Sequence, residues 1–476
     1  MSVLTTAQAA LAAAATAQAG SRRPRQVPLV QRMTWGANDG ELALYRSLGA
    51  AGYIDYHLHP EFINDNAMDN ILALPTYNML SLLPEQFVGQ NAGNTVGQLT
   101  RAMLVRAIYS KRQLFERMVE FWSDHFNIWA AQDGVPLFKI PDDRDVIRAN
   151  ALGNFGTMLR GSAHSPAMLE YLNNNTNTAS SPNENYAREL MELHTLSVTG
   201  PYTQNDVHEV ARCFTGWTYY NGSSGSNSYR FRYNSAVHDT AAKVVLGNVI
   251  PARSAAAGQQ DGEDVLNILI AHPATAQFIS RKLLVRFWGY DPSQSAVDTI
   301  AAVFTASGGD IRTVMQAVLG LVAAAAPPLK LKRPIHLLVS AIRSMQTKIT
   351  SHTSFPASLQ TPLVQAGHSP FNWQSPDGYP DSVAYWQGGE LARWNFGADL
   401  LNNAYGGIFL DIIALTAGAT TPSGVASQIN KVIFAETLYP ADLAAITAYL
   451  GPTNPTSTKI REAIGLALAS PSFQWY

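Results

Sequence analysis

The sequence predicts a mainly α protein, with one multi-helical body and a small β-hairpin flap inserted near residues 228–251. Apolar residues recur at spacings of three and four through most of the chain, which is the period of an amphipathic helix. Only the flap region shows the two-residue alternation of a strand. With 476 residues, 46% of them hydrophobic, the chain is long enough to bury a large core.

The helical pattern is clearest between Leu114 and Phe126, where apolar residues mark one face of a helix. Further helices are expected near residues 41–58, 97–110, 142–160, 166–172, 183–197, 204–217, 262–288, 293–305, 310–325, 334–346, 386–404, 423–432, 440–450 and 457–469.

The flap is predicted from two segments. Tyr229 to Tyr233 alternates aromatic residues with arginines, as a half-exposed strand does. Lys243 to Ile250 is expected to be its hairpin partner, with Gly247-Asn248 as the turn. A second irregular segment, Gly367 to Asp381, holds three prolines, which exclude a helix interior, and several aromatic residues including Trp373. Loops of this composition often line pockets.

We expect two parts, an Ala-rich N-terminal arm over residues 1–28 and a single helical domain over residues 29–476. Only 14% of residues are charged and the net charge is -2, so nucleic acid is not expected as a partner. No apolar run reaches the length of a transmembrane helix. The single cysteine, Cys213, excludes a disulfide framework and is expected to be buried.

A first candidate site lies at Trp122 to Asn127, where a carboxylate and an imidazole stand among aromatic residues. Asp124 or His125 could act as an acid or base there, with Trp122 contacting the substrate. Glu116 and Glu120 precede Asp124 at four-residue intervals on one helix face. The alternative is a solvated row of carboxylates beside a core histidine.

A second candidate site is the segment Asn183 to Thr195, which concentrates charge in a charge-poor chain. Arg188 is one turn from Glu192, which predicts an ion pair. In a straight helix at about 100° per residue, His194 projects roughly 140° away from Glu189, so the two cannot share one metal ion. Glu189, Glu192 and His194 are catalytic candidates and Arg188 a binding residue; a structural ion-pair network, joined by Arg212, remains the alternative.

Three more residues are candidates for substrate binding. His238 and Lys243 flank the predicted flap, from which they could reach over a pocket, and Trp217 offers a flat face nearby. The alternative for His238 is a capped turn. No zinc motif, P-loop, nucleotide fingerprint or serine elbow is present, so no metal ligands and no cofactor are assigned.

Several of these motifs together resemble a bacterial family of unknown function numbered 1800. They are the segment from Trp122 to Phe126, the segment from Asn183 to Thr195, the pair His238-Asp239 and the loop from Gly367 to Asp381. The resemblance runs from about Val30 to Phe473 and implies one family-wide domain, common in exported proteins. No charged n-region of a signal peptide precedes Arg22, so the compartment is left open.

Three functions are compatible with these residues. The first is a hydrolase that cleaves a glycan or another polymer with a carboxylate pair drawn from Asp124, Glu189 and Glu192. The second is a ligand-binding or scaffold protein whose aromatic loops hold a partner without reaction. The third is a metal-dependent oxidoreductase using His125, His194 and His238.

Overall fold

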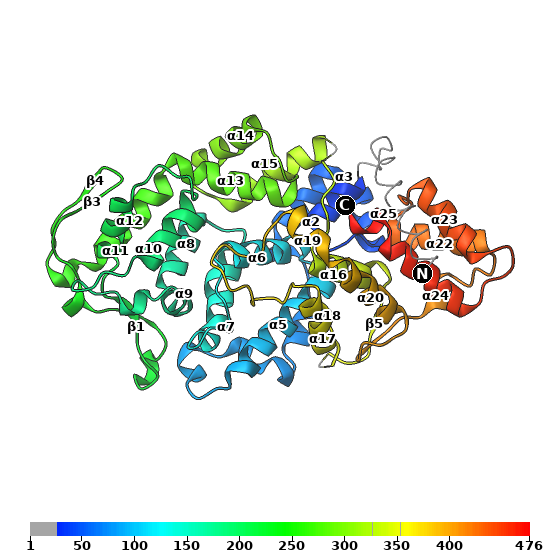
Figure 1. Ribbon diagram of the computed structural model, residues 1–476, viewed down its shortest axis with the longest axis horizontal. Coiled ribbons are helices and arrows are strands. Elements are labelled where there is room, and N and C mark those ends of the chain that lie inside the picture. Colours follow the sequence, from blue (N-terminus) through cyan, green and yellow to red (C-terminus); the bar gives the residue numbers. More distant parts are fainter. Residues whose placement is uncertain (1–25, 326, 353) are drawn as a thin grey trace.

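The computed structural model describes residues 26–325, 327–352 and 354–476, and it confirms the mainly α fold (Figure 1). The predicted arm lies outside the described residues up to residue 25; its last three residues begin the first helix. Within the described chain, no helix is both long and apolar enough to cross a membrane.

The α- and π-helices described before residue 326 are α2 (Gln26–Met33), α3 (Asp39–Leu58), α4 (Asn66–Leu72), α5 (Ala92–Tyr109), α6 (Gln113–His125), α7 (Lys139–Pro141), the π-helix η6 (Asp142–Arg148), α8 (Phe155–His164), α9 (Pro166–Tyr171), α10 (Glu184–Glu189), the π-helix η8 (Leu190–Thr195), α11 (Gln204–Cys213), α12 (Gln259–Ala271), α13 (Pro273–Phe287), α14 (Gln294–Ala306) and α15 (Ile311–Ala324), and short 3-10 helices lie between them.

The later helices are α16 (Pro334–Ser344), α17 (Ser354–Ser358), α18 (Gln360–Gln365), α19 (Val383–Trp386), α20 (Glu390–Leu401), α21 (Ile412–Leu415), α22 (Pro422–Phe434), α23 (Pro440–Leu450), α24 (Ser457–Ala469) and α25 (Pro471–Gln474). Most lie where the apolar period predicts them. The helix predicted over 262–288 is split at His272, because the residue before a proline disfavours helical dihedrals. The one predicted over 142–160 is a π-helix followed by α8, which Asn154 caps.

The flap consists of two hairpins, so the predicted strand pairing was wrong. Strand β1 (Trp217–Tyr219) pairs with β2 (Phe231–Tyr233), and β3 (Lys243–Val245) pairs with β4 (Asn248–Ile250). Leu246 and Gly247 both have positive φ, as a two-residue hairpin turn requires, so the segment from Lys243 folds back on itself. A third two-stranded sheet joins β5 (Lys348–Ile349) to β6 (Ile408–Phe409).

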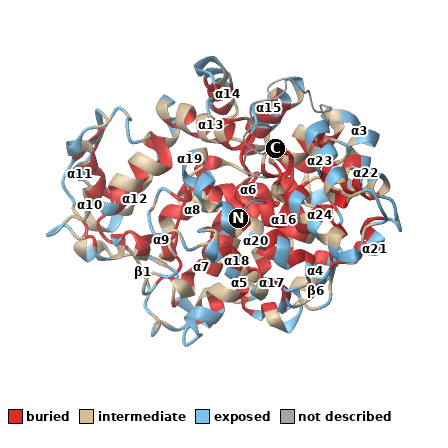
Figure 2. Ribbon diagram, turned by 45° about the vertical axis from the view of Figure 1, so that its right-hand side comes forward, coloured by how far each residue is buried: buried red, intermediate tan, exposed pale blue. Residues whose placement is uncertain are grey.

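Two large hydrophobic cores fill the described body. Helices α2, α3, α6 and α8 to α15 enclose most of the first, and α16, α20 and α22 to α24 enclose most of the second. In Figure 1, α8 to α12 lie to the left of α6, and α20 and α22 to α24 lie to the right of α16. Figure 2 shows buried residues continuing through the centre between them. Trp35 and three residues of α5 belong to the second core, so the N-terminal part of the chain contributes to both.

A buried ion-pair network occupies the centre of the molecule. Glu120 of α6 accepts from Arg286 of α13 and lies 2.9 Å from Arg333 Nη2, just before α16. Arg333 Nη1 donates to Asp124 Oδ2 at 2.7 Å. Asp381 lies 3.5 Å from Arg286 and 3.0 Å from the Lys330 ammonium. Removing one member of such a network leaves its partners as unpaired buried charges, which lowers the stability of the fold strongly.

The Glu120→Gln variant is therefore expected to lower the free energy of unfolding by about 3–5 kcal/mol, measured by urea denaturation. The control is Glu61→Gln, which removes an exposed ion pair with Arg312 and should cost within about 1 kcal/mol. Equal effects of the two variants would show that the central network does not hold the fold together.

Candidate functional site

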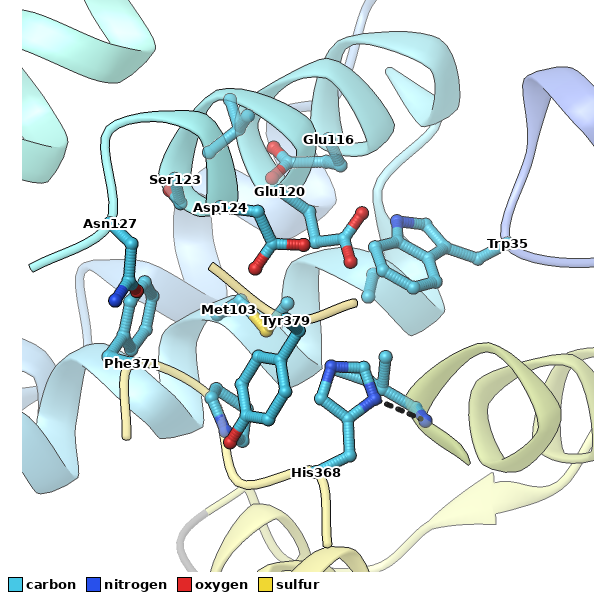
Figure 3. Close-up of a pocket in the computed structure, with 14 residues that line it drawn as sticks. Trp35, Met103, Glu116, Glu120, Ser123, Asp124, Asn127, His368, Phe371 and Tyr379 are labelled. Carbon is cyan, nitrogen blue, oxygen red and sulfur yellow. Dashed lines mark hydrogen bonds between the residues drawn. The ribbon is translucent and has the colours of Figure 1, made fainter. Parts of the chain in front are cut away.

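The carboxylates of α6 line a pocket rather than facing solvent. The pocket has an empty volume of about 530 Å³, open solvent at its mouth included. Figure 3 shows Glu120 and Asp124 pointing from α6 toward His368 and Tyr379. The solvated row considered from the sequence is excluded, because Glu116 and Glu120 are only 6% and 7% exposed. The remaining lining residues are Trp35, Met103, Ala107, Val119, Ser123, Asn127, Ile335, Pro370 and Phe371.

The loop from Gly367 to Asp381 forms one wall of this pocket, as predicted. Asn127 donates to the carbonyls of Trp373 and Ser375 at 3.0 and 2.7 Å. The Tyr171 hydroxyl of α9 donates to the Gln374 carbonyl at 2.7 Å. These side chains hold the irregular backbone against the end of α6, so the loop has a defined position without helix or strand bonds.

At Gly378 the loop backbone approaches α6 closely. Its φ is +74°, and a Cβ built there would lie 2.1 Å from the Asp124 carbonyl oxygen. Only glycine fits here, because any other residue would be strained in the left-handed backbone conformation and its Cβ would collide with α6. The position of the loop over Asp124 therefore depends on this residue.

The two central carboxyls have pKa values shifted in opposite directions. Burial raises the pKa of Asp124, as does the neighbouring Glu120, while Arg333 opposes the shift. The pKa of Glu120 is lowered despite its burial, because Arg286, Arg333 and Arg117 surround it. Neighbouring acids separated in this way can hold different protonation states at one pH. Asp124, whose side chain is 21% exposed, is the one accessible to a ligand.

Lys282 of α13 is a further functional group that the sequence pattern did not single out. Burial lowers its pKa to about 8, against the opposing fields of Asp124 and Asp377. No described carboxylate forms an ion pair with it; its ammonium lies 5.4 Å from the centre of the Phe278 ring. An amine in this state is a candidate proton carrier or anion ligand.

Glu189 is half-buried, and its carboxylate accepts no hydrogen bond or ion pair from any described residue. Burial raises its pKa first, and the negative fields of Glu192 and Asp377 add to that shift, while Arg188 opposes it. Asp377 belongs to the loop, where Trp373 Nε1 donates to its Oδ1 at 2.8 Å. Glu189 thus lies within electrostatic reach of the loop that covers Asp124.

The neighbours of Glu189 are engaged in ion pairs. Arg188 lies 3.2 Å from Glu184 and 3.5 Å from Glu192, which confirms the predicted pair with Glu192. Arg212 does not join this network; it pairs instead with Glu209 and Asp239. The free carboxyl of the segment is therefore Glu189.

The straight-helix geometry assumed for this segment was wrong. The helix widens into the π-helix η8 directly after Glu189, and the Leu196 amide donates to the Met191 carbonyl, five residues back. Such π-turns are rare and often occur at functional sites. His194 nevertheless faces the core, where its ring lies 5.1 Å from Phe126 and 6.0 Å from His125.

Trp122, His125 and His194 form an aromatic layer behind the pocket. Trp122 donates to the Ala151 carbonyl at 3.1 Å, and His125 Nε2 lies 3.2 Å from the His194 carbonyl oxygen. Burial lowers the pKa of His125 far below its usual range and that of His194 to about 3, so both rings are neutral.

The residues predicted around the flap belong to a separate cluster against α12. His238 Nε2 and the Lys243 ammonium lie 3.2 and 2.5 Å from the Asp261 carboxylate, and both side chains are fully buried. Trp217 is also buried and stacks on His164 at 4.7 Å. The structure therefore does not bring these three residues to the pocket beside Asp124. In the described part of the chain, no group of three His, Cys, Asp or Glu side chains is placed to hold a metal ion.

Sequence reasoning missed Arg286, Arg333, Lys282 and Asp377. The three basic residues carry no local signal, since each stands in an ordinary helical or helix-start context. Asp377-Gly378 is a turn signal inside a loop already expected to line a pocket.

The Gly378→Ala variant is expected to lower the melting temperature and loosen the loop, because the added methyl group collides with α6. The control is Gly367→Ala, which has the same left-handed backbone at φ +70° but no atom within 4 Å of the added Cβ. Thermal unfolding followed by tryptophan fluorescence should show the larger loss for Gly378→Ala. A loss no greater than that of Gly367→Ala would mean that close packing of the loop on α6 is unimportant.

Comparison with known proteins gives one match. The chain matches the model of a protein family of unknown function, DUF1800, over residues 28–475. No curated protein and no solved structure matches it. Because this match spans nearly the whole chain, with the α6 carboxylates, Glu189 and the loop from Gly367 to Asp381 inside it, the chain belongs to the DUF1800 family.

Proposed function

We propose that this DUF1800 protein hydrolyses a polymer, with a glycan as the favoured substrate, by carboxyl acid–base chemistry. Glu189 acts as the proton donor and Asp124 as the second carboxyl. The observation that supports this most directly is the state of Glu189, a half-buried acid with a raised pKa and no ion-pair or hydrogen-bond partner among the described residues. A general acid needs a pKa raised toward the working pH.

Asp124 suits the complementary role. Arg333 holds its carboxylate at 2.7 Å, which fixes its orientation. The same guanidinium opposes the rise in the pKa of Asp124 that burial causes, and so acts in favour of the ionised form that a base requires. Asp377 acts electrostatically on both Glu189 and Lys282, and Lys282 also lies within reach of Asp124. Trp373 belongs to the same loop as Asp377, to which its indole N–H donates, and offers a flat apolar face for a sugar ring.

A binding function without catalysis is the second candidate. It is supported by the ion pair of Asp124 with Arg333, which also accounts for this carboxylate as part of the central network. Under that function Glu189 is a destabilising acid with no chemical role, and the two candidates differ in what Glu189→Gln does.

The Glu189→Gln variant should lose turnover by about 10²–10⁴-fold, the usual contribution of a general acid, while remaining folded. The assay measures reducing ends released from a panel of purified polysaccharides, with circular dichroism to verify folding. Glu184→Gln on the same helix is the control, since this acid pairs with Arg188 and His208 on the outer side of α10. A Glu189→Gln protein that keeps wild-type turnover rules out the proposed role, and a wild-type protein that cleaves no polymer rules out the hydrolase.

The pH dependence supplies an independent test. If Glu189 is the acid, kcat/KM falls as the pH rises through its pKa, because only the protonated form donates. Glu192→Gln removes a negative field that raises this pKa, so the descending limb should move to lower pH. A pH–rate profile of both proteins measures the shift; an unmoved limb, or one displaced to higher pH, contradicts the assignment.

A further inference from the structure

A second pocket lies between α19, the start of α20 and the final segment of the chain. Its empty volume is about 970 Å³, open solvent included, which is nearly twice that of the pocket beside Asp124. Three tryptophans line it, Trp386, Trp394 and Trp475, together with a few polar side chains. A cavity with flat aromatic walls and few polar groups is the usual form of a small-ligand site.

The aromatic wall is rigidly placed. Trp386 is 3% exposed, and its indole N–H donates to the Pro380 carbonyl at 2.6 Å. The same ring packs against His368 at 4.9 Å and Tyr379 at 6.0 Å, two residues that line the first pocket. Trp386 therefore separates the two pockets and presents a fixed apolar surface to the second.

Arg393 of α20 supplies a buried positive charge to this pocket. Arg393 is only 5% exposed, and its Nη1 donates to Gln474 Oε1 at 3.1 Å. Gln474 in turn donates to the Leu468 carbonyl at 2.9 Å, so it is held in place as an acceptor. The Arg393 Nη2 group is buried and has no hydrogen-bond partner.

This arrangement is unfavourable without a ligand. No described carboxylate lies within ion-pair distance of Arg393, and burial lowers its pKa to about 10. Burying an unpaired cation costs free energy because the cation loses its contacts with water, and an anion beside the guanidinium would offset that cost. The nearest acid on the same helix is Glu390, which is exposed and also lines the pocket.

We propose that this pocket binds a saccharide unit that carries a carboxylate, with its ring faces on the tryptophans and its carboxylate beside the Arg393 guanidinium. Sugar rings pack on indole faces through their C–H surfaces, and arginine is the preferred partner of carboxylates. The Gln474 amide oxygen accepts from Nη1 and so fixes the guanidinium. This site is separate from Glu189, so the proposal does not depend on the hydrolase activity.

The test is isothermal titration of the full chain with trigalacturonate and with its methyl ester, which has the same sugar rings but uncharged, methylated carboxyl groups. Hyaluronan and sialyllactose, each beside its methyl ester, extend the test to other acidic saccharides. At least one acid should bind saturably and about tenfold or more tightly than its ester, because the ester cannot form a charge-assisted hydrogen bond. Absence of binding by all three acids overturns the proposal, as does equal binding of acid and ester.

Variants locate the binding to this pocket. Arg393→Gln should remove the preference for the acid, and Trp394→Ala should weaken acid and ester alike. Glu390→Gln should strengthen binding of the acid, because it removes a like charge at the pocket. Leu391→Ala, a residue of the same helix that is 69% exposed and outside the lining, is the control and should change nothing.

Each variant result has a contrary outcome. Retained preference for the acid in a folded Arg393→Gln protein overturns the assignment of the carboxylate. If Arg393→Gln does not fold, Glu390→Gln and Trp394→Ala decide the question, and unchanged affinities in both place the binding elsewhere. Since all these readouts are binding isotherms, failure of the hydrolase proposal leaves them unaffected.

Discussion

The buried ion-pair network between α6, α13 and the start of α16 is the interaction on which the rest of the molecule depends. Arg333 is its centre, because its two terminal nitrogens reach Glu120 and Asp124 and one of them also lies 3.0 Å from His368. Through it the two hydrophobic cores are joined by charge rather than by apolar contact alone. Buried ion pairs of this kind add little net stability. They favour one arrangement of the helices, because any other arrangement would leave buried charges unpaired at a high cost in free energy.

The same network also sets the charge states of the carboxyl groups in the pocket beside Asp124. Glu120 is saturated with guanidinium partners and stays ionised, so Asp124 is left as the carboxyl that responds to its surroundings. The loop from Gly367 to Asp381 then covers Asp124, and its Asp377 carries the electrostatic field onward to Glu189. Glu120, which holds the fold together, thus lies beside Asp124, which is available for reaction. The two roles need neighbouring charged groups, and this explains why a chain with few charges gathers them around this pocket.

The sequence predicts well the features that depend on one short segment, and poorly those that depend on residues brought together by folding. Helix positions follow from apolar period, and the loop from Gly367 to Asp381 follows from its prolines, because both are properties of short segments. The pairing of β1 with β2 depends on contacts between two segments. The alternation of residue types within one segment does not show which other segment it pairs with. Lys282, Arg286 and Arg333 reach Asp124 only through tertiary packing. His238 and Lys243 looked available in sequence, yet Asp261, a distant residue of α12, binds both.

The most direct test of this account is the pKa of Glu189 in the folded protein. It can be measured by following the side-chain carboxyl carbon in ¹³C-glutamate-labelled protein through a pH titration, with Glu189→Gln to assign the signal. The account predicts a pKa above the ordinary glutamate value of about 4.3. A pKa at or below that value would contradict it, because the surroundings of Glu189 would then not favour the protonated form from which a general acid donates.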